Sequence, residues 1–315
     1  MQVYDTMLGS KLIPNGRNPN IIKPAAANPI HPNRALLYIA LAAVLWSTSG
    51  LLIKLIDLNP FAIAGLRSIV ASALMIAWLR GRLHFNFSYP QQAGALAYAI
   101  TMVLFVSATK MTTAANAILL QYTAPVFTAL LGAWILKEKV TRFDWLVIAT
   151  VFGGMLLFFI DRLSLAGFWG NIMAVGSGIS MSYFILCMRM QKDESTLETI
   201  LLGNIVTALI CIPFYFQQTP TIINWLALIY MGTLQIGLSF ILYSIAIKSV
   251  KAIDAVLMQV VDPLLNPVWV FLIIGETPGI WAIAGGLIVL TAVTYRNIRV
   301  NRNNKEAPRE APLTH

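Results

Sequence analysis

The stretch KMTTAANAILLQYTAPVFTALLGAWILKE, residues 110–138, is followed later in the chain by a related stretch, KSVKAIDAVLMQVVDPLLNPVWVFLIIGE, residues 248–276. Without gaps, the copies share polar and proline positions at a constant offset of 138 residues (248 minus 110): Lys110 with Lys248, Gln121 with Gln259, Pro125 with Pro263 and Glu138 with Glu276. Such a match inside apolar sequence is hard to obtain by chance. Because the offset is nearly half the chain, it predicts two related halves rather than a solenoid.

The composition predicts a membrane protein. Apolar residues make up 58% of the chain and charged residues 11%, against about 45–50% and about 25% in soluble domains. The net charge of +9 is explained by cytoplasmic Lys and Arg, so we expect no nucleic-acid partner. Cys187 and Cys211 lie in apolar segments, and His31, His84 and His315 lie in tails or a loop. We therefore expect no disulfide, metal or other cofactor.

Ten apolar segments are long enough to cross a bilayer, which needs about 20 residues per helix. They are 35–56, 60–80, 90–109, 113–136, 143–160, 167–189, 198–217, 221–247, 252–274 and 278–296. The fold class is thus an all-α polytopic membrane protein with ten transmembrane helices in two five-helix repeats, 35–160 and 161–297. Residues 1–34 read as a disordered tail and residues 298–315 as a basic tail.

The distribution of basic residues predicts the orientation. Of the 22 Lys and Arg residues, Lys110 and Arg162 fall on the far side, and Lys54 and Arg67 fall in or near the membrane, which leaves eighteen on the side of the N-terminus. Both termini are therefore expected in the cytoplasm. Five helices per half is an odd number, so the second repeat is inverted relative to the first. Inverted repeats are typical of secondary transporters.

These features resemble the drug/metabolite transporter superfamily, in particular its EamA-type members. The matching stretches are Trp46-Ser47-Thr48-Ser49-Gly50 with Lys54, Arg67 after Asn59-Pro60, Pro125 to Glu138, and Pro263 to Gly275-Glu276 with Gly285-Gly286. The first half departs from the pattern at Lys137, where the family usually has Gly. The resemblance covers about 34–297 and implies a multi-pass inner-membrane transporter of small metabolites, often an exporter of amino acids or related amphiphiles.

Asp262 is the strongest candidate for a residue that binds a proton or the substrate. It lies eight residues beyond Asp254, so helix rise places it ~12 Å from the cytoplasmic face. A carboxylate at that depth normally faces a cavity or a partner. It is either a proton-coupling or substrate-amine site, or a structural acid that pairs with a cation or with backbone freed by Pro263 and Pro267. The first half has Ala124 at the equivalent position.

The prolines Pro125, Pro263 and Pro267 each remove one helical hydrogen bond. In transporters such breaks expose backbone groups to a cavity and allow gating, whereas elsewhere they are kinks satisfied by neighbouring helices. Gln121 and Gln259 lie one turn before the repeated prolines. Their amides are predicted either to contact substrate or to join helices.

Arg67 lies seven residues into its helix. It could pair with Asp57, with Asp262 or with a substrate carboxylate, or it could extend its long side chain to the membrane interface. Polar and aromatic residues in the middle of other segments are further candidates for lining a substrate pocket, with bundle packing as the alternative: Trp46, Tyr122, Tyr183, Gln235 and Tyr243.

We therefore predict a secondary transporter, in the exporting direction, of a small organic metabolite such as an amino acid or related amphiphile. It would work by alternating access around a central cavity, with possible proton coupling, as a monomer or homodimer. The alternatives are a lipid-carrier flippase or a receptor-like binding protein. No phosphate-binding loop, zinc-protease motif or hydrolase nucleophile motif occurs in the sequence, so we do not expect an enzyme.

Overall fold

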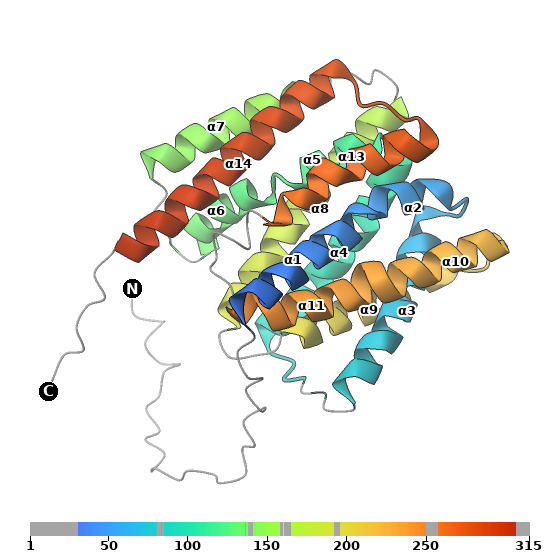
Figure 1. The fold of residues 1–315 in the computed structure, drawn as a ribbon. Coiled ribbons are helices and arrows are strands. Elements are labelled where there is room, and N and C mark those ends of the chain that lie inside the picture. The colour runs from blue at the N-terminus through green and yellow to red at the C-terminus, as the bar shows by residue number, and fades with distance from the viewer. Residues whose placement is uncertain are drawn as a thin grey trace, which may run out of the picture.

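The computed structural model describes residues 31–80, 83, 85–135, 137, 141–157, 160, 165–191, 196–249 and 258–306 as a bundle of helices (Figure 1). Within these ranges there is no β-strand. The predicted N-terminal tail up to residue 30, residues 307–315, Glu138 and Asp254 lie outside them.

The described part of the first half forms seven helices, in the order α1 (Pro32–Ser47), α2 (Ser49–Leu55), α3 (Pro60–Leu79), α4 (Tyr89–Met111), α5 (Ala114–Gln121), α6 (Ala124–Ile135) and α7 (Arg142–Leu157). The starts of α3 and α4 follow ordinary capping chemistry. The Asn59 side chain accepts a hydrogen bond from the Phe61 backbone N–H at 2.9 Å, with Pro60 as the first helical residue of α3. The Ser88 side chain caps α4 in the same way.

In its described residues, the second half contains two long helices, α8 (Leu165–Met190) and α14 (Ile280–Glu306), and several shorter elements. The shorter elements are α9 (Thr196–Ile210), the short 3₁₀ turn η1 (Ile212–Phe214), α10 (Ile222–Tyr230), the π-helix η2 (Met231–Leu238), α11 (Ser239–Ala246), the 3₁₀ turn η3 (Ile247–Ser249) and α13 (Val261–Ile274). The elements α10, η2 and α11 follow one another as a single rod, and the π-helix widens its middle. Such π segments occur frequently at functional sites.

Each predicted apolar segment contains a helix, but the lengths differ. Among the described residues, seven single helices or runs of consecutive helices are long and apolar enough to cross a membrane. They are Asn33–Leu55, Pro60–Leu79, Tyr89–Met111, Ala114–Ile135, Gly167–Met190, Ile222–Ala246 and Ile280–Arg299. The helices α7, α9 and α13 have 16, 15 and 14 residues, which is shorter than the length that a bilayer core requires. The protein is thus a multi-pass membrane protein.

The structure corrects the predicted C-terminal boundary. The sequence predicts a tail from residue 298, whereas α14 continues as helix to Glu306. Residues 297–306 contain no glycine or proline, so the helix has no breaker before Pro308. The beginning of the predicted tail is therefore a helical extension of the last apolar segment.

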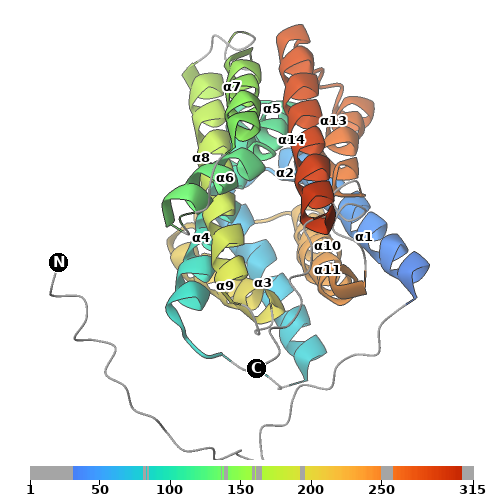
Figure 2. The ribbon, with the colours of Figure 1, turned by 90° about the vertical axis from the view of Figure 1, so that its left-hand side faces the viewer.

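The two halves of the chain interlock rather than form separate bodies. Helices of the first half pack against helices of the second, in the pairs α4 with α8, α3 with α9, α3 with η2, α1 with α11, α1 with α13, and α7 with α14. Figures 1 and 2 both show α7 and α14 lying side by side. The largest apolar cluster contains Ile63 and Leu120 from the first half and Val289 from the second. A site at the centre of the bundle is therefore built from both halves.

Candidate functional site

The helices that carry the repeated prolines are interrupted at equivalent positions. The first breaks at Tyr122 and Thr123, between α5 and α6, and the second has a turn at Val260, just before α13. Pro263 has no N–H, so it leaves the Gln259 carbonyl without its helical partner. The Tyr122 hydroxyl lies 3.0 Å from that carbonyl oxygen. The break in one half is thus bound to the break in the other.

Asp262 lies at this junction. Its side chain is buried, with 6% of its surface exposed. Its Oδ2 atom is 3.1 Å from the Tyr122 hydroxyl, and its Oδ1 atom has no hydrogen-bond partner among the described residues. No cation is recorded in an ion pair with it in the described part of the chain. The structural alternative, an acid neutralised by Lys or Arg, is therefore not what the described residues show.

Aromatic side chains continue the site from Gln259. The Gln259 amide donates a hydrogen bond to the Tyr243 hydroxyl at 3.1 Å. The Tyr243 ring lies 5.6 Å from the Trp46 ring, measured between centroids, and Trp46 lies 5.2 Å from Phe240. We name the predicted residues that meet here the central network: Trp46, Tyr122, Tyr243, Gln259 and Asp262. It joins α1 and the α5–α6 break to α11 and α13 (Figure 1).

Arg67 lies in the interior of the bundle. Its side chain is only 1% exposed, so it is covered by neighbouring helices and does not extend into solvent, as the interfacial alternative would require. Its guanidinium donates a hydrogen bond to the Met102 sulfur at 3.5 Å, and its Nε atom has no partner in the described residues. The pairings with Asp57 and Asp262 are likewise absent from the described contacts. Among the described residues, a weak sulfur acceptor is thus the one hydrogen-bond partner of this buried cation.

An aromatic path leads from the central network toward Arg67. Phe240, which contacts Trp46, also lies 6.0 Å from the ring of Tyr98 on α4. Tyr98 is fully buried and accepts a hydrogen bond from Asn204 at 3.3 Å. Met102 follows Tyr98 by one helical turn, so both side chains lie on one face of α4. Tyr98 was not predicted from the sequence, and its counterpart in the second half is Ile236.

Three predicted residues lie apart from this path. The Gln121 amide donates to the Ser177 hydroxyl on α8 at 2.6 Å, and this contact joins two helices. The Tyr183 hydroxyl lies 3.0 Å from that of Tyr89, at the start of α4. Gln235 is buried in the π-helix, with its side-chain oxygen unpartnered in the described part of the chain.

Further contacts that were not predicted from the sequence join α13 to the helix break at Thr48, which separates α1 from α2. The Trp269 indole N–H donates to the Ser47 hydroxyl at 3.0 Å, and the Asn266 amide donates to the Ser49 hydroxyl at 3.2 Å. Asn266 precedes Pro267, inside α13. The Asn266-Pro267 pair, which the first copy of the repeat lacks, marks one side of these contacts in the sequence.

A charged cluster closes one end of the bundle. Lys54 Nζ is 2.9 Å from Glu276 Oε2, and the other Glu276 oxygen accepts a hydrogen bond from the Ala114 backbone N–H at 2.7 Å. The carboxylate thus sits at the N-terminus of α5, where the helix dipole favours negative charge. Lys54 also donates to the Thr112 carbonyl at 2.7 Å. We name the Lys54, Glu276 and Ala114 contact the clasp.

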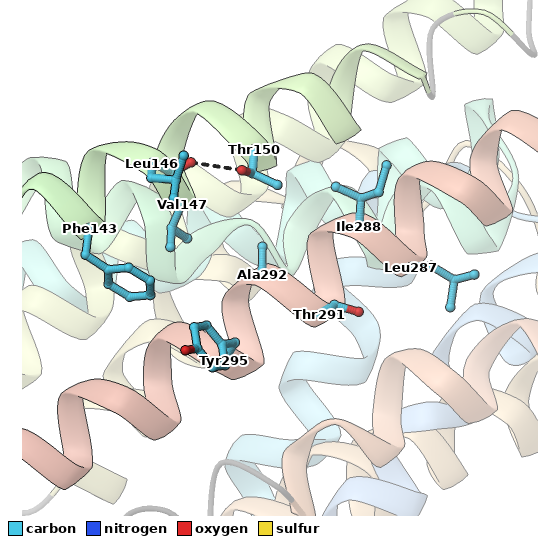
Figure 3. A pocket seen from close by; sticks show the side chains of 9 residues that line it. All are labelled: Phe143, Leu146, Val147, Thr150, Leu287, Ile288, Thr291, Ala292 and Tyr295. Carbon is cyan, nitrogen blue, oxygen red and sulfur yellow. Dashed lines mark hydrogen bonds between the residues drawn. The ribbon is translucent and has the colours of Figure 1, made fainter.

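A separate groove lies between α7 and α14 (Figure 3). Its lining is mainly apolar: Phe143, Leu146, Val147, Thr150, Leu287, Ile288, Thr291, Ala292 and Tyr295. The Thr150 hydroxyl donates to the Leu146 carbonyl of its own helix at 2.9 Å. None of the predicted site residues lines this groove, and no charged side chain does, so it is not the candidate site.

Comparisons with known proteins agree with this architecture. The EamA-like transporter family matches twice, over residues 33–160 and 168–296. An uncharacterized transporter of Bacillus subtilis, YwfM, is 25% identical over 281 residues, which are 81% of this chain and 93% of that protein. An uncharacterized transporter of Archaeoglobus fulgidus is 25% identical over 280 residues, 82% of this chain and 95% of that one.

A solved crystal structure has the same fold, with a TM-score of 0.60 and 18% identity, over 86% of this chain and all of that one. The family match covers both halves of the chain, so the internal repeat is a duplicated domain. The chain belongs to the EamA-like transporter family.

Proposed function

We propose that the protein is a secondary transporter that exports a small organic metabolite by alternating access. The observation that carries the proposal is the central network, which lies between the two halves, buried or half-buried, and bridges both helix breaks. The proposal includes ten membrane crossings in two inverted repeats, in the inner membrane, with both termini in the cytoplasm. Interrupted helices at a repeat interface are typical of binding sites in transporters.

The hydrogen bonds around Asp262 support proton coupling. The Tyr122 hydroxyl faces two acceptors, the Gln259 carbonyl and Asp262 Oδ2, and it has one proton to donate. When Asp262 is ionised, one of these buried acceptors lacks a donor. When Asp262 is protonated, it donates to Tyr122, and Tyr122 donates to Gln259. Binding and release of a proton at Asp262 would thus rearrange the bond that joins the two breaks.

The clasp supports a state that is closed toward the outside. In the proposed orientation, Lys54 and Glu276 lie at the outer ends of α2 and α13. Their contact ties the loop between α13 and α14 to the first turn of α5. Opening of this end requires the clasp to break. Pro125, Pro263 and Pro267 would act as gating positions, because helix segments on either side of a break can tilt separately.

The test is transport by purified protein in proteoliposomes. Candidate solutes come from a metabolomic comparison of medium from cells with and without the gene. We expect flux that increases when a proton gradient is imposed and that loses this dependence in Asp262→Asn. Asp144→Asn is the matched control, since Asp144 pairs with Arg296 at 2.8 Å, outside the central network.

Two results would contradict the proposal. Flux that ignores the proton gradient and survives Asp262→Asn would exclude the coupling role of Asp262. Tight lipid binding with no solute flux, for any compound that the metabolomic comparison reveals, would favour a lipid flippase instead.

A further inference from the structure

Arg67 carries a buried charge that the described protein does not balance. A guanidinium cannot lose its proton in a protein and presents five N–H donors. Here the direct acceptor is one thioether sulfur, and the Nε donor has none among the described residues. Its electrostatic neighbours are the Tyr98 hydroxyl and the Cys211 thiol, neither of which carries a fixed negative charge.

None of the acidic side chains whose contacts are described forms an ion pair with Arg67. Glu198, buried near the start of α9, has an interaction of its own. Asp144 pairs with Arg296, and Glu276 pairs with Lys54. Asp57 lies in the loop before α3, in the electrostatic environment of Lys110. Asp262 bonds Tyr122. Since a buried cation is stable only when it is paired, the missing anion has to come from outside this part of the chain.

We propose that Arg67 binds the carboxylate of the transported substrate, which makes the substrate an organic acid or amino acid. This inference rests on the proposed transport function and deepens it. The planar guanidinium matches a carboxylate with two parallel hydrogen bonds. Arg67 lies seven residues into α3, ~10 Å from the end of that helix, where water does not compete for the pair.

The surroundings predict the rest of the substrate. From Arg67, the path runs along Tyr98 and Phe240 to Trp46, and the last two rings are half-buried. The Trp46 indole nitrogen has no partner among the described residues. Aromatic faces favour an apolar or aromatic body. A carboxylate at Arg67 therefore places such a body against these rings.

The test is ligand-dependent thermal stability of the full-length protein in detergent. The probes are four acids, each with its neutral amide: 3-phenylpropionate, phenylacetate, hexanoate and phenylalanine. A ligand that binds the folded state raises the melting temperature. We expect at least one acid to stabilise the wild type more than its amide does. In Arg67→Gln this difference should disappear, because the variant should bind the acid at least about tenfold more weakly than the wild type does.

Two further variants separate binding from a structural role. Arg67→Lys keeps the charge without the planar fork, so it should bind the acid with intermediate strength. Arg296→Gln is the matched control, because Arg296 has its own carboxylate partner, and it should retain the preference for the acid. Without ligand, Arg67→Gln should melt no lower than the wild type, because it removes an unpaired buried charge.

The inference is overturned by any of three results: no acid stabilises the wild type, acid and amide stabilise it equally, or Arg67→Gln keeps the preference. A lower unliganded melting temperature in Arg67→Gln would likewise indicate that Arg67 holds the helices together. This binding measurement needs no flux, so it remains readable if transport fails. Conversely, flux of a carboxylate that is unchanged in Arg67→Gln refutes this inference and leaves the transport function intact.

Discussion

Removal of one charge from the clasp should shift the protein toward an outward-open state. Glu276→Gln keeps the shape of the side chain but loses the ion pair with Lys54 and the charge at the start of α5. Both clasp side chains are mostly buried, 18% and 17% exposed, so solvent screens the pair only in part. A charge at a helix N-terminus and a charge-assisted hydrogen bond together contribute about 1–2 kcal/mol.

This free energy translates directly into populations if the clasp exists only in the closed state. A change of about 1–2 kcal/mol shifts a two-state equilibrium by a factor of about 5–30. Pulsed electron resonance between spin labels at Leu55 and Ile280 would measure it, since both side chains are exposed and flank the clasp. The native Cys187 and Cys211 are buried and are replaced by alanine for labelling.

We expect the longer-distance population to grow in Glu276→Gln and in Lys54→Gln. Because both variants break the same contact, the double variant should add little to either one. Distance distributions that match those of the wild type would refute the role of the clasp. Fully additive effects would mean that the two residues act separately.

Two further predictions test the packing and the hydrogen bonds of the site. Tyr122→Phe removes the hydroxyl that bonds Asp262 and leaves buried acceptors unsatisfied, which costs about 1–3 kcal/mol; gradient-driven flux in proteoliposomes should fall about tenfold or more, and unchanged flux contradicts this. Gly232→Ala would place a Cβ atom in steric overlap with the Val70 Cβ, so it should lower the melting temperature by overpacking that costs about 1–3 kcal/mol. Gly153→Ala is the control. Outside its own stretch of helix no atom lies within 4 Å of the added Cβ, so the melting temperature should stay unchanged.

The helices and helix breaks that depend only on nearby residues could be predicted from the sequence. Each apolar segment contains a helix. The helices are interrupted just before the repeated prolines, at Tyr122–Thr123 and Val260, because a proline removes a helical hydrogen bond wherever it stands. The resemblance to EamA-type transporters is confirmed by the family match. The end of α14 was predicted too early, because polar residues do not end a helix that lacks a breaker.

The contacts of the site could not be predicted in the same way. Lys54 and Glu276 are 222 positions apart (276 minus 54) and lie on different halves of the chain. No periodicity within either segment indicates that they meet. The burial of Arg67 depends on three neighbouring elements, α4, α9 and η2, which pack against α3. Its position on one helix was equally compatible with exposure at the interface.

The differences between the two copies of the repeat explain why the proposed proton site is single. Tyr122 and Asp262 bond each other across the two halves, and their counterparts at the 138-residue offset are Val260 and Ala124. The equivalent pair in the other copy is therefore apolar and cannot hold a proton. Both copies keep the proline that breaks the helix, so both retain the hinge. Each contributes only one member of the polar pair, Tyr122 from the first and Asp262 from the second. The proposed coupling is thus one proton per cycle, and it requires the two halves to meet at this bond.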